Sequence, residues 1–60
     1  MSKKRKIWID RINAWYFSEP FNKFVVVARI KEDGVWKFER LFFNTREEAE
    51  RLEEGQYIKY

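Results

Sequence analysis

The sequence predicts an α+β fold, in which a three-stranded antiparallel β-sheet (a meander) packs against one carboxy-terminal α-helix. Two apolar segments, residues 24–31 and 35–43, flank a short turn that contains Gly34, as in a β-hairpin. An aromatic segment, residues 7–17, precedes them and ends at a Ser-Glu-Pro turn. A capped helical pattern follows them. The 60 residues suffice for one small domain with a thin core.

The first strand, residues 7–17, can present either of two alternating sets of side chains to the core. The more apolar set, which is interrupted by Asp10, would point inward and consists of Trp8, Ile12, Ala14 and Tyr16. The side chains that this choice leaves outward are Ile7, Ile9, Arg11, Asn13, Trp15 and Phe17. The opposite assignment fits nearly as well, so the pattern leaves the buried face of this strand open.

The turn between the second and third strands decides which residues pair across the hairpin. A two-residue turn at Asp33-Gly34 would place Lys37 and Glu39 on the apolar face. A three-residue loop that begins at Glu32, with Gly34 in the left-handed conformation, avoids this. It pairs Ile30 with Trp36, Ala28 with Phe38, Val26 with Arg40, and Phe24 with Phe42. We therefore predict the three-residue loop, with Trp36, Phe38 and Phe42 on the core face.

A helix is predicted after the third strand. Thr45 and Glu48 form a Thr-x-x-Glu capping box, whose side chains bind free amides in the first helical turn. Gly55 suits the position just past the end of the helix, where a positive φ is favoured. Between these residues only Ala49 and Leu52 are apolar, so the helix can cover one face of the sheet. Residues 56–60 alternate weakly and allow a short extra carboxy-terminal strand.

The composition argues against an enzyme. The chain has no cysteine and no histidine, and Thr45 is committed to a cap, so no nucleophile has a base beside it. The glutamates of the helix are expected to form a solvated face rather than a metal site. A glycine-rich phosphate loop is also missing from the sequence. We therefore expect no catalytic residues, no metal, no cofactor and no small-molecule substrate.

The net charge of +3 is unevenly divided. Residues 3–6 are all basic and contribute +4, so residues 1–6 are expected to be a basic, flexible tail in front of a single domain of residues 7–60. The helical segment, residues 45–54, carries five glutamates against two arginines and would repel a phosphate backbone. Because no export signal or membrane span is evident, we expect a cytoplasmic protein. The balance of Lys, Arg and Glu is reported for proteins of hot environments.

The sheet face that the helix leaves open is the predicted binding surface. With the first choice of faces it combines cations, an amide and aromatic surface, which suit phosphates, base edges and sugars. This pattern favours nucleic acid as the partner, and duplex DNA in particular. The predicted contact residues on the sheet are Arg11, Asn13, Trp15, Arg29, Lys31 and Lys37. The auxiliary phosphate contacts in the tail are Lys3, Lys4, Arg5 and Lys6.

The junction between the third strand and the helix, Phe-Phe-Asn-Thr-Arg-Glu-Glu-Ala-Glu at residues 42–50, carries a family resemblance. Together with the order of three strands and a helix, it resembles the AP2-like, arm-binding amino-terminal DNA-binding domains of phage and transposon integrases. The resemblance covers residues 24–52 and implies a sheet that enters the major groove with a helix packed behind it. The strands of this chain carry fewer Lys and Arg than is usual in that family.

A protein-binding or self-associating module is the alternative, for example a small regulator of a virus or mobile element. Its interface would be an apolar patch on the open sheet face, formed by Val25, Val27, Leu41 and Phe43. The partner would be a second copy of the chain or another protein. Salt separates the two hypotheses, because DNA binding weakens steeply as salt rises whereas an apolar interface persists.

Overall fold

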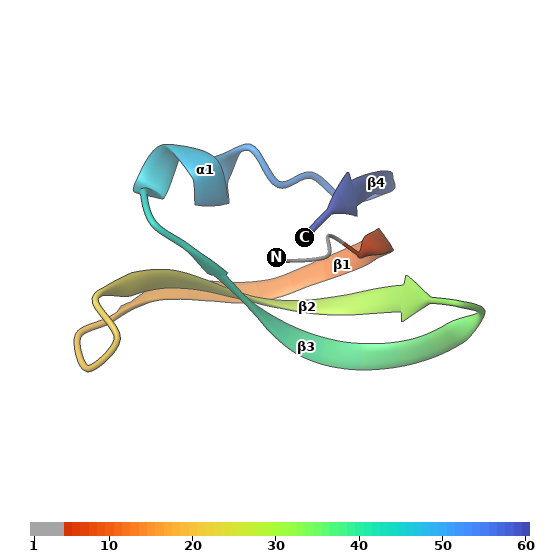
Figure 1. Ribbon diagram of the computed structural model, residues 1–60, viewed down its shortest axis with the longest axis horizontal. Helices are drawn as coiled ribbons and strands as arrows, with labels where there is room; N and C mark the ends of the chain where they lie inside the picture. Colours follow the sequence, from red (N-terminus) through yellow and green to blue (C-terminus); the bar gives the residue numbers. More distant parts are fainter. Residues whose placement is uncertain (1–4) are drawn as a thin grey trace.

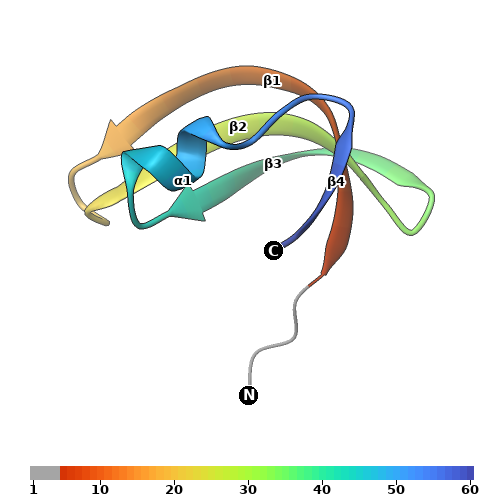
Figure 2. The same ribbon diagram turned by 90° about the horizontal axis from the view of Figure 1, so that it is seen from above.

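A computed structural model describes residues 5–60 as one curled antiparallel sheet with a short helix on its concave side (Figure 1). The strand order is β3-β2-β1-β4, so the α+β class and the antiparallel sheet are confirmed, and residues 56–59 add a fourth strand beside β1. In Figure 2 the helix lies over the hairpin strands, and β4 crosses in front of the start of β1, the strand with which it pairs. The elements are β1 (Lys6–Ser18), β2 (Lys23–Glu32), β3 (Val35–Phe43), α1 (Arg46–Glu50) and β4 (Gln56–Lys59).

The β2–β3 hairpin turns through two residues, so the predicted three-residue loop is wrong. Asp33 and Gly34 both have positive φ, 52° and 78°, as a two-residue turn that matches the strand twist requires. Ile30 therefore pairs with Lys37 rather than with Trp36. The prediction failed because it treated charges on the concave face as unacceptable, whereas the structure pairs them with one another.

Two bulges in β1 decide which of its side chains face the core. The pairing with β2 skips Asp10 and Asn13, each of which is an extra residue without a partner in β2. Each bulge shifts the alternation by one position, so one face collects residues with irregular spacing. The side chains on the concave side are Ile7, Ile9, Ile12, Trp15 and Phe17. Of the predicted inward set only Ile12 is correct, because Trp8, Ala14 and Tyr16 lie on the convex side.

The helix α1 starts as predicted but ends early. The Glu48 amide donates to the Thr45 hydroxyl and the Thr45 amide donates to the Glu48 carboxylate, both at 3.2 Å, which completes the capping box. Arg51 caps the other end, so the helix has five residues and does not extend to Gly55. Gly55 does have a positive φ, 80°, but it leads into β4, and its amide donates to the Ile9 carbonyl at 2.7 Å.

The core fills the concave side of the sheet beneath α1. Its buried members are Ile7, Ile9, Val26, Ala28, Ile30, Leu41, Ala49 and Leu52. Phe24 packs against this core as predicted, but the three aromatic residues of β3 that were predicted for it do not belong to it, because the two-residue turn reverses the faces of β3. Trp36, Phe38 and Phe42 lie on the convex side and are 45%, 68% and 40% exposed. The burial of small and branched side chains thus leaves large aromatic rings on the surface.

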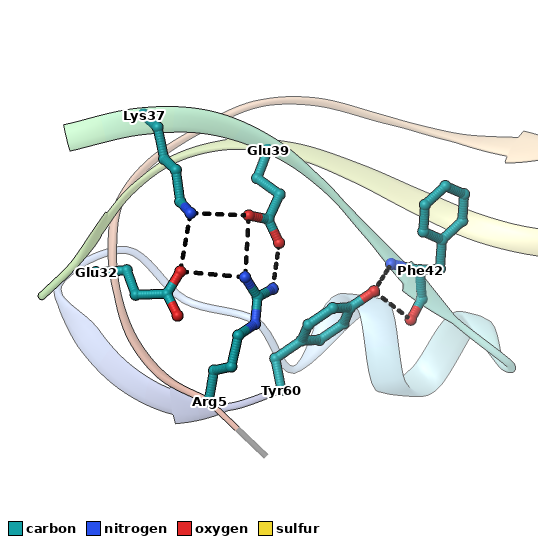
Figure 3. A network of polar contacts seen from close by, with 6 residues as sticks. All are labelled: Arg5, Glu32, Lys37, Glu39, Phe42 and Tyr60. Atoms are coloured by element: carbon teal, nitrogen blue, oxygen red, sulfur yellow. Dashed lines mark hydrogen bonds and ion pairs between the residues drawn. The ribbon is translucent and has the colours of Figure 1, made fainter. Parts of the chain in front are cut away.

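Four charged side chains form a network on the concave side, at the end that α1 leaves uncovered (Figure 3). Arg5 contacts Glu32 at 3.1 Å and also pairs closely with Glu39. Lys37 lies 2.9 Å from Glu32 and 3.8 Å from Glu39. Each cation therefore lies between both carboxylates, which compensates the charges that the curled sheet brings together.

Tyr60 closes the same side of the molecule beside this network (Figure 3). The Phe42 amide donates to the Tyr60 hydroxyl oxygen at 2.6 Å, and that hydroxyl donates to the Phe42 carbonyl at 3.4 Å. The Tyr60 and Arg5 backbones also exchange two hydrogen bonds of 2.8 Å. Tyr60, which follows β4, is thereby bonded to β3, the strand at the opposite edge of the sheet.

Because of this network, we expect the folded protein to lose stability in acid. A hydrogen bond from Lys37 lowers the pKa of the Glu32 carboxyl below its ordinary value of 4.5, so this group stabilises the fold above that pH and ceases to do so as the pH falls through the lowered pKa. Glu32→Gln should therefore lower the urea midpoint at pH 7, and its difference from the unmodified protein should shrink in strong acid. Glu19→Gln in the exposed β1–β2 turn is the control. An equal difference at both pH values would contradict the prediction.

Candidate nucleic-acid interface

The convex side of the sheet, which α1 does not cover, is organised as four rows of side chains that cross the strands. The first row spans all four strands and the others span three. From the turn at Gly34 onward, the rows are Trp36-Lys31-Trp8-Tyr57, then Phe38-Arg29-Arg11, then Arg40-Val27-Ala14, then Phe42-Val25-Tyr16. We call these rows together the convex face. Aromatic and basic residues are interleaved in it.

The charge of the convex face is mainly positive. Its rows carry Arg11, Arg29, Lys31 and Arg40, and Lys6 joins them at the start of β1. Asp10 lies beside it in the first bulge, 3.8 Å from Arg29, and Asp33 lies at the turn. By contrast, Glu32 and Glu39 face the concave side, and the glutamates after Thr45 lie on and after α1. The five cations of the convex face thus lie apart from most of the carboxylates, whereas Arg5 and Lys37 are paired with Glu32 and Glu39 on the concave side.

Several cations rest on the rings of the first row. The Arg29 guanidinium carbon and the Lys31 Nζ lie 4.8 and 5.1 Å from the centre of the Trp36 ring. Lys6 Nζ lies 4.7 Å from the Tyr57 ring. Such cation–π contacts are weak at exposed sites and place positive charge next to flat apolar surface. Trp8 packs edge-to-face on Tyr57, with ring centres 4.8 Å apart.

Three of the predicted sheet contacts lie on the convex face, and a fourth, Asn13, lies in a bulge of β1. Arg11 and Arg29 pair directly across β1 and β2 on the convex face, and Lys31 lies in its first row. All three side chains are exposed. Asn13 is exposed in the second bulge of β1, next to the convex face. The structure therefore brings together the basic part of the predicted surface.

Two predicted sheet contacts, Trp15 and Lys37, lie on the concave side, so their assignment to the open face is wrong. Trp15 lies beside the helix, where Arg46 stacks on its ring at 5.5 Å from the ring centre. Lys37 belongs to the charged network with Glu32. The bulges displaced Trp15 from the expected face, and the two-residue turn displaced Lys37.

Two of the four basic residues of the predicted tail belong to the fold, and the other two lie outside the described residues. Arg5 is held in the concave network, so it does not project as a phosphate contact. Lys6 begins β1 and borders the convex face. Lys3 and Lys4 lie outside the described residues. The folded unit thus begins at least two residues before the predicted start at residue 7.

The predicted protein interface does not form one surface. Leu41 is fully buried in the core and Phe43 packs against it, both on the concave side. Val25 and Val27 lie on the convex face, where Val25 is fully buried between its row neighbours Tyr16 and Phe42. The four residues therefore face opposite sides of the sheet.

Sequence reasoning missed the aromatic part of the convex face. Trp8 and Trp36 were assigned to the core, and Tyr57 was not considered as a contact. Asp-Gly between alternating segments is a strong signal for a two-residue hairpin. That signal places Trp36 on the outer face. The same register puts Glu32 and Glu39 on one face with Lys37, which indicates that these charges can compensate one another.

Comparisons with known proteins give no relative from which a role could be taken. No protein-family model, curated protein or solved structure matches the chain. Among residues 5–60, no helix is long and apolar enough to cross a membrane. Within the same range, acidic side chains do not gather into a group that could hold a metal ion.

Proposed function

We propose that this protein binds nucleic acid through its convex face. The observation that supports this most directly is the separation of charge by the curled sheet. Lys6, Arg11, Arg29, Lys31 and Arg40 gather beside exposed aromatic rings, while most carboxylates lie on the helix and the concave side. Nucleic-acid surfaces combine phosphate charge with flat bases and sugars, and this face offers partners for each of them.

In this proposal, the helix and the concave side of the sheet support the convex face and do not contact the nucleic acid. The helix and the charged network fill or close the concave side, so the convex side is free to meet a polyanion. The arm-binding domains of integrases, which the sequence resembles, use the sheet as the reading surface with the helix packed behind it, and the proposal gives this chain the same arrangement. The sequence favours duplex DNA, and strands that lie in a DNA groove are an established way of reading it. The charges alone suit either a duplex or a single strand.

Fluorescence anisotropy at several salt concentrations tests the proposal. A labelled 20-base-pair duplex of random sequence and a single strand of the same length serve as probes. We expect binding at low salt, with an affinity that falls as salt rises, because each phosphate contact releases counterions. Absence of binding to both probes at about 20 mM salt would refute the proposal; such salt leaves electrostatic attraction largely unscreened.

Self-association is the outcome that would favour the alternative function. Exposed aromatic side chains of the convex face, such as Phe38, would then be buried between two copies of the sheet. Sedimentation velocity of the free protein distinguishes the cases. A salt-resistant dimer that binds neither probe would support a protein interface in place of a nucleic-acid surface.

A further inference from the structure

The first row of the convex face lines two adjoining hollows. One of about 250 Å³ is lined by Trp8, Lys31, Trp36 and Tyr57. The other, of about 460 Å³, shares three of these residues and extends past Lys6 to the turn at Gly34. We call the two together the aromatic hollow. Each of the four strands contributes one residue of the first row to its wall, so the sheet itself fixes its shape.

The spacing of the strands that carry the two tryptophans of this hollow leaves room for a flat guest. Trp36 and Trp8 occupy β3 and β1, with β2 between them, so their backbones lie about 9–10 Å apart at ordinary strand spacing. Lys31 is the side chain between them. Because its stem is flexible and its ammonium is exposed, it can move aside without disturbing the core. A planar ring could then lie against one or both tryptophans.

The charges around the hollow select the chemistry of the guest. Lys6, Arg29 and Lys31 lie over the Tyr57 and Trp36 rings, which disfavours a cationic guest and favours an anion joined to an aromatic ring. A nucleotide has this composition. A base that stacks on an aromatic side chain gains more than an exposed cation–π contact provides, so it can displace a lysine from the ring.

We propose that the aromatic hollow takes an unpaired base of a single-stranded nucleic acid, stacked on Trp36 or Trp8, while Lys6 and Lys31 turn to the adjacent phosphates. This inference rests on the proposed function. It narrows the ligand of the protein from nucleic acid in general to a strand with accessible bases. In a duplex the base faces are already stacked and the hollow cannot reach them. The expected preference is therefore for single strands, and no base identity is selected because every base has a stacking face.

Wild-type protein and three labelled octamers separate base binding from phosphate binding. The octamers are deoxyuridine DNA, uridine RNA, and a strand in which every nucleotide is an abasic tetrahydrofuran analogue. We expect at least one base-bearing octamer to bind roughly five- to hundredfold more tightly than the abasic one at equal salt. The two base-bearing probes show whether the strand is DNA or RNA. Equal affinity for all three would overturn the hollow yet leave the proposed function intact, whereas no binding to any nucleic acid would remove both.

Substitutions locate the base on the surface. Trp36→Ala and Trp8→Ala each remove one of the two candidate rings, and at least one of them should reduce affinity for the base-bearing octamer towards the abasic level and leave binding of the abasic octamer unchanged. Phe21→Ala is the matched control, because Phe21 is an aromatic residue that is 66% exposed in the β1–β2 turn, outside the hollow. Trp36→Phe should retain most of the affinity. If neither tryptophan variant loses more affinity than Phe21→Ala, the base binds outside the hollow.

Discussion

Replacing Leu41 with alanine is expected to lower the free energy of unfolding by about 2–5 kcal/mol, as truncation of a fully buried leucine does. Leu41 has no exposed surface and packs in the core beside Val26, its partner in β2. A domain of this length has a total stability of about 3–9 kcal/mol. The variant should therefore unfold at a much lower urea concentration, or be largely unfolded at 25 °C.

Phe38→Ala is the control for this experiment and also tests the register of the hairpin. Phe38 is 68% exposed on the convex face, so its truncation should change the free energy of unfolding by only about 0.5 kcal/mol. The three-residue loop would bury Phe38 and expose Leu41. A larger loss of stability for Phe38→Ala than for Leu41→Ala would therefore contradict the two-residue turn at Asp33 and Gly34.

Removing two cations from the convex face should weaken nucleic-acid binding strongly. In the double variant Arg29→Ala and Lys31→Ala, we expect affinity at low salt to fall by on the order of tenfold for each cation. The slope of log affinity against log salt should become shallower by about 2, because two phosphate contacts are lost. Both side chains are exposed, so the thermal midpoint should change little.

The matched control removes the same charge from the other side of the sheet. The double variant Arg46→Ala and Arg51→Ala lowers the net charge by the same two units, but these residues lie at the two ends of α1 on the concave side. Its affinity should stay near that of the unmodified protein. Equal losses in the two double variants would indicate that overall charge, rather than the convex face, controls binding.

The elements of this fold were predictable from local signals, but their faces were not. The bounds of β3 and the capping box at Thr45 follow from turn chemistry and short-range patterns, which the structure confirms. The face of β1 depends on bulges at Asp10 and Asn13, which nothing in a simple alternation marks. The face of β3 depends on whether Lys37 can be tolerated on the concave side. Lys37 pairs with Glu32 close by in the sequence, but the charges of Glu32 and Glu39 are balanced only with Arg5, which lies 27 and 34 positions from them.

The candidate site was predictable only in its basic part. Arg29 and Lys31 alternate with the apolar residues Ala28 and Ile30 in β2, and this pattern places them on the convex face without any knowledge of β1. The aromatic hollow combines residues from all four strands, so its recognition needed both the correct hairpin register and the pairing of β4 with β1. Trp8 and Trp36 were placed on the core side by the choice of strand face and hairpin register that gathered the most apolar residues on one side of the sheet.

The contact between Tyr60 and the backbone of Phe42 limits how this sheet can associate with other chains. β3 is an outermost strand, and outermost strands offer free backbone groups to which a foreign peptide or a second sheet can add. At Phe42 both backbone groups already bind the Tyr60 hydroxyl. A fifth strand that added along β3 would have to expel this side chain. The fold thus protects part of its longer rim from aggregation with a side chain of its own.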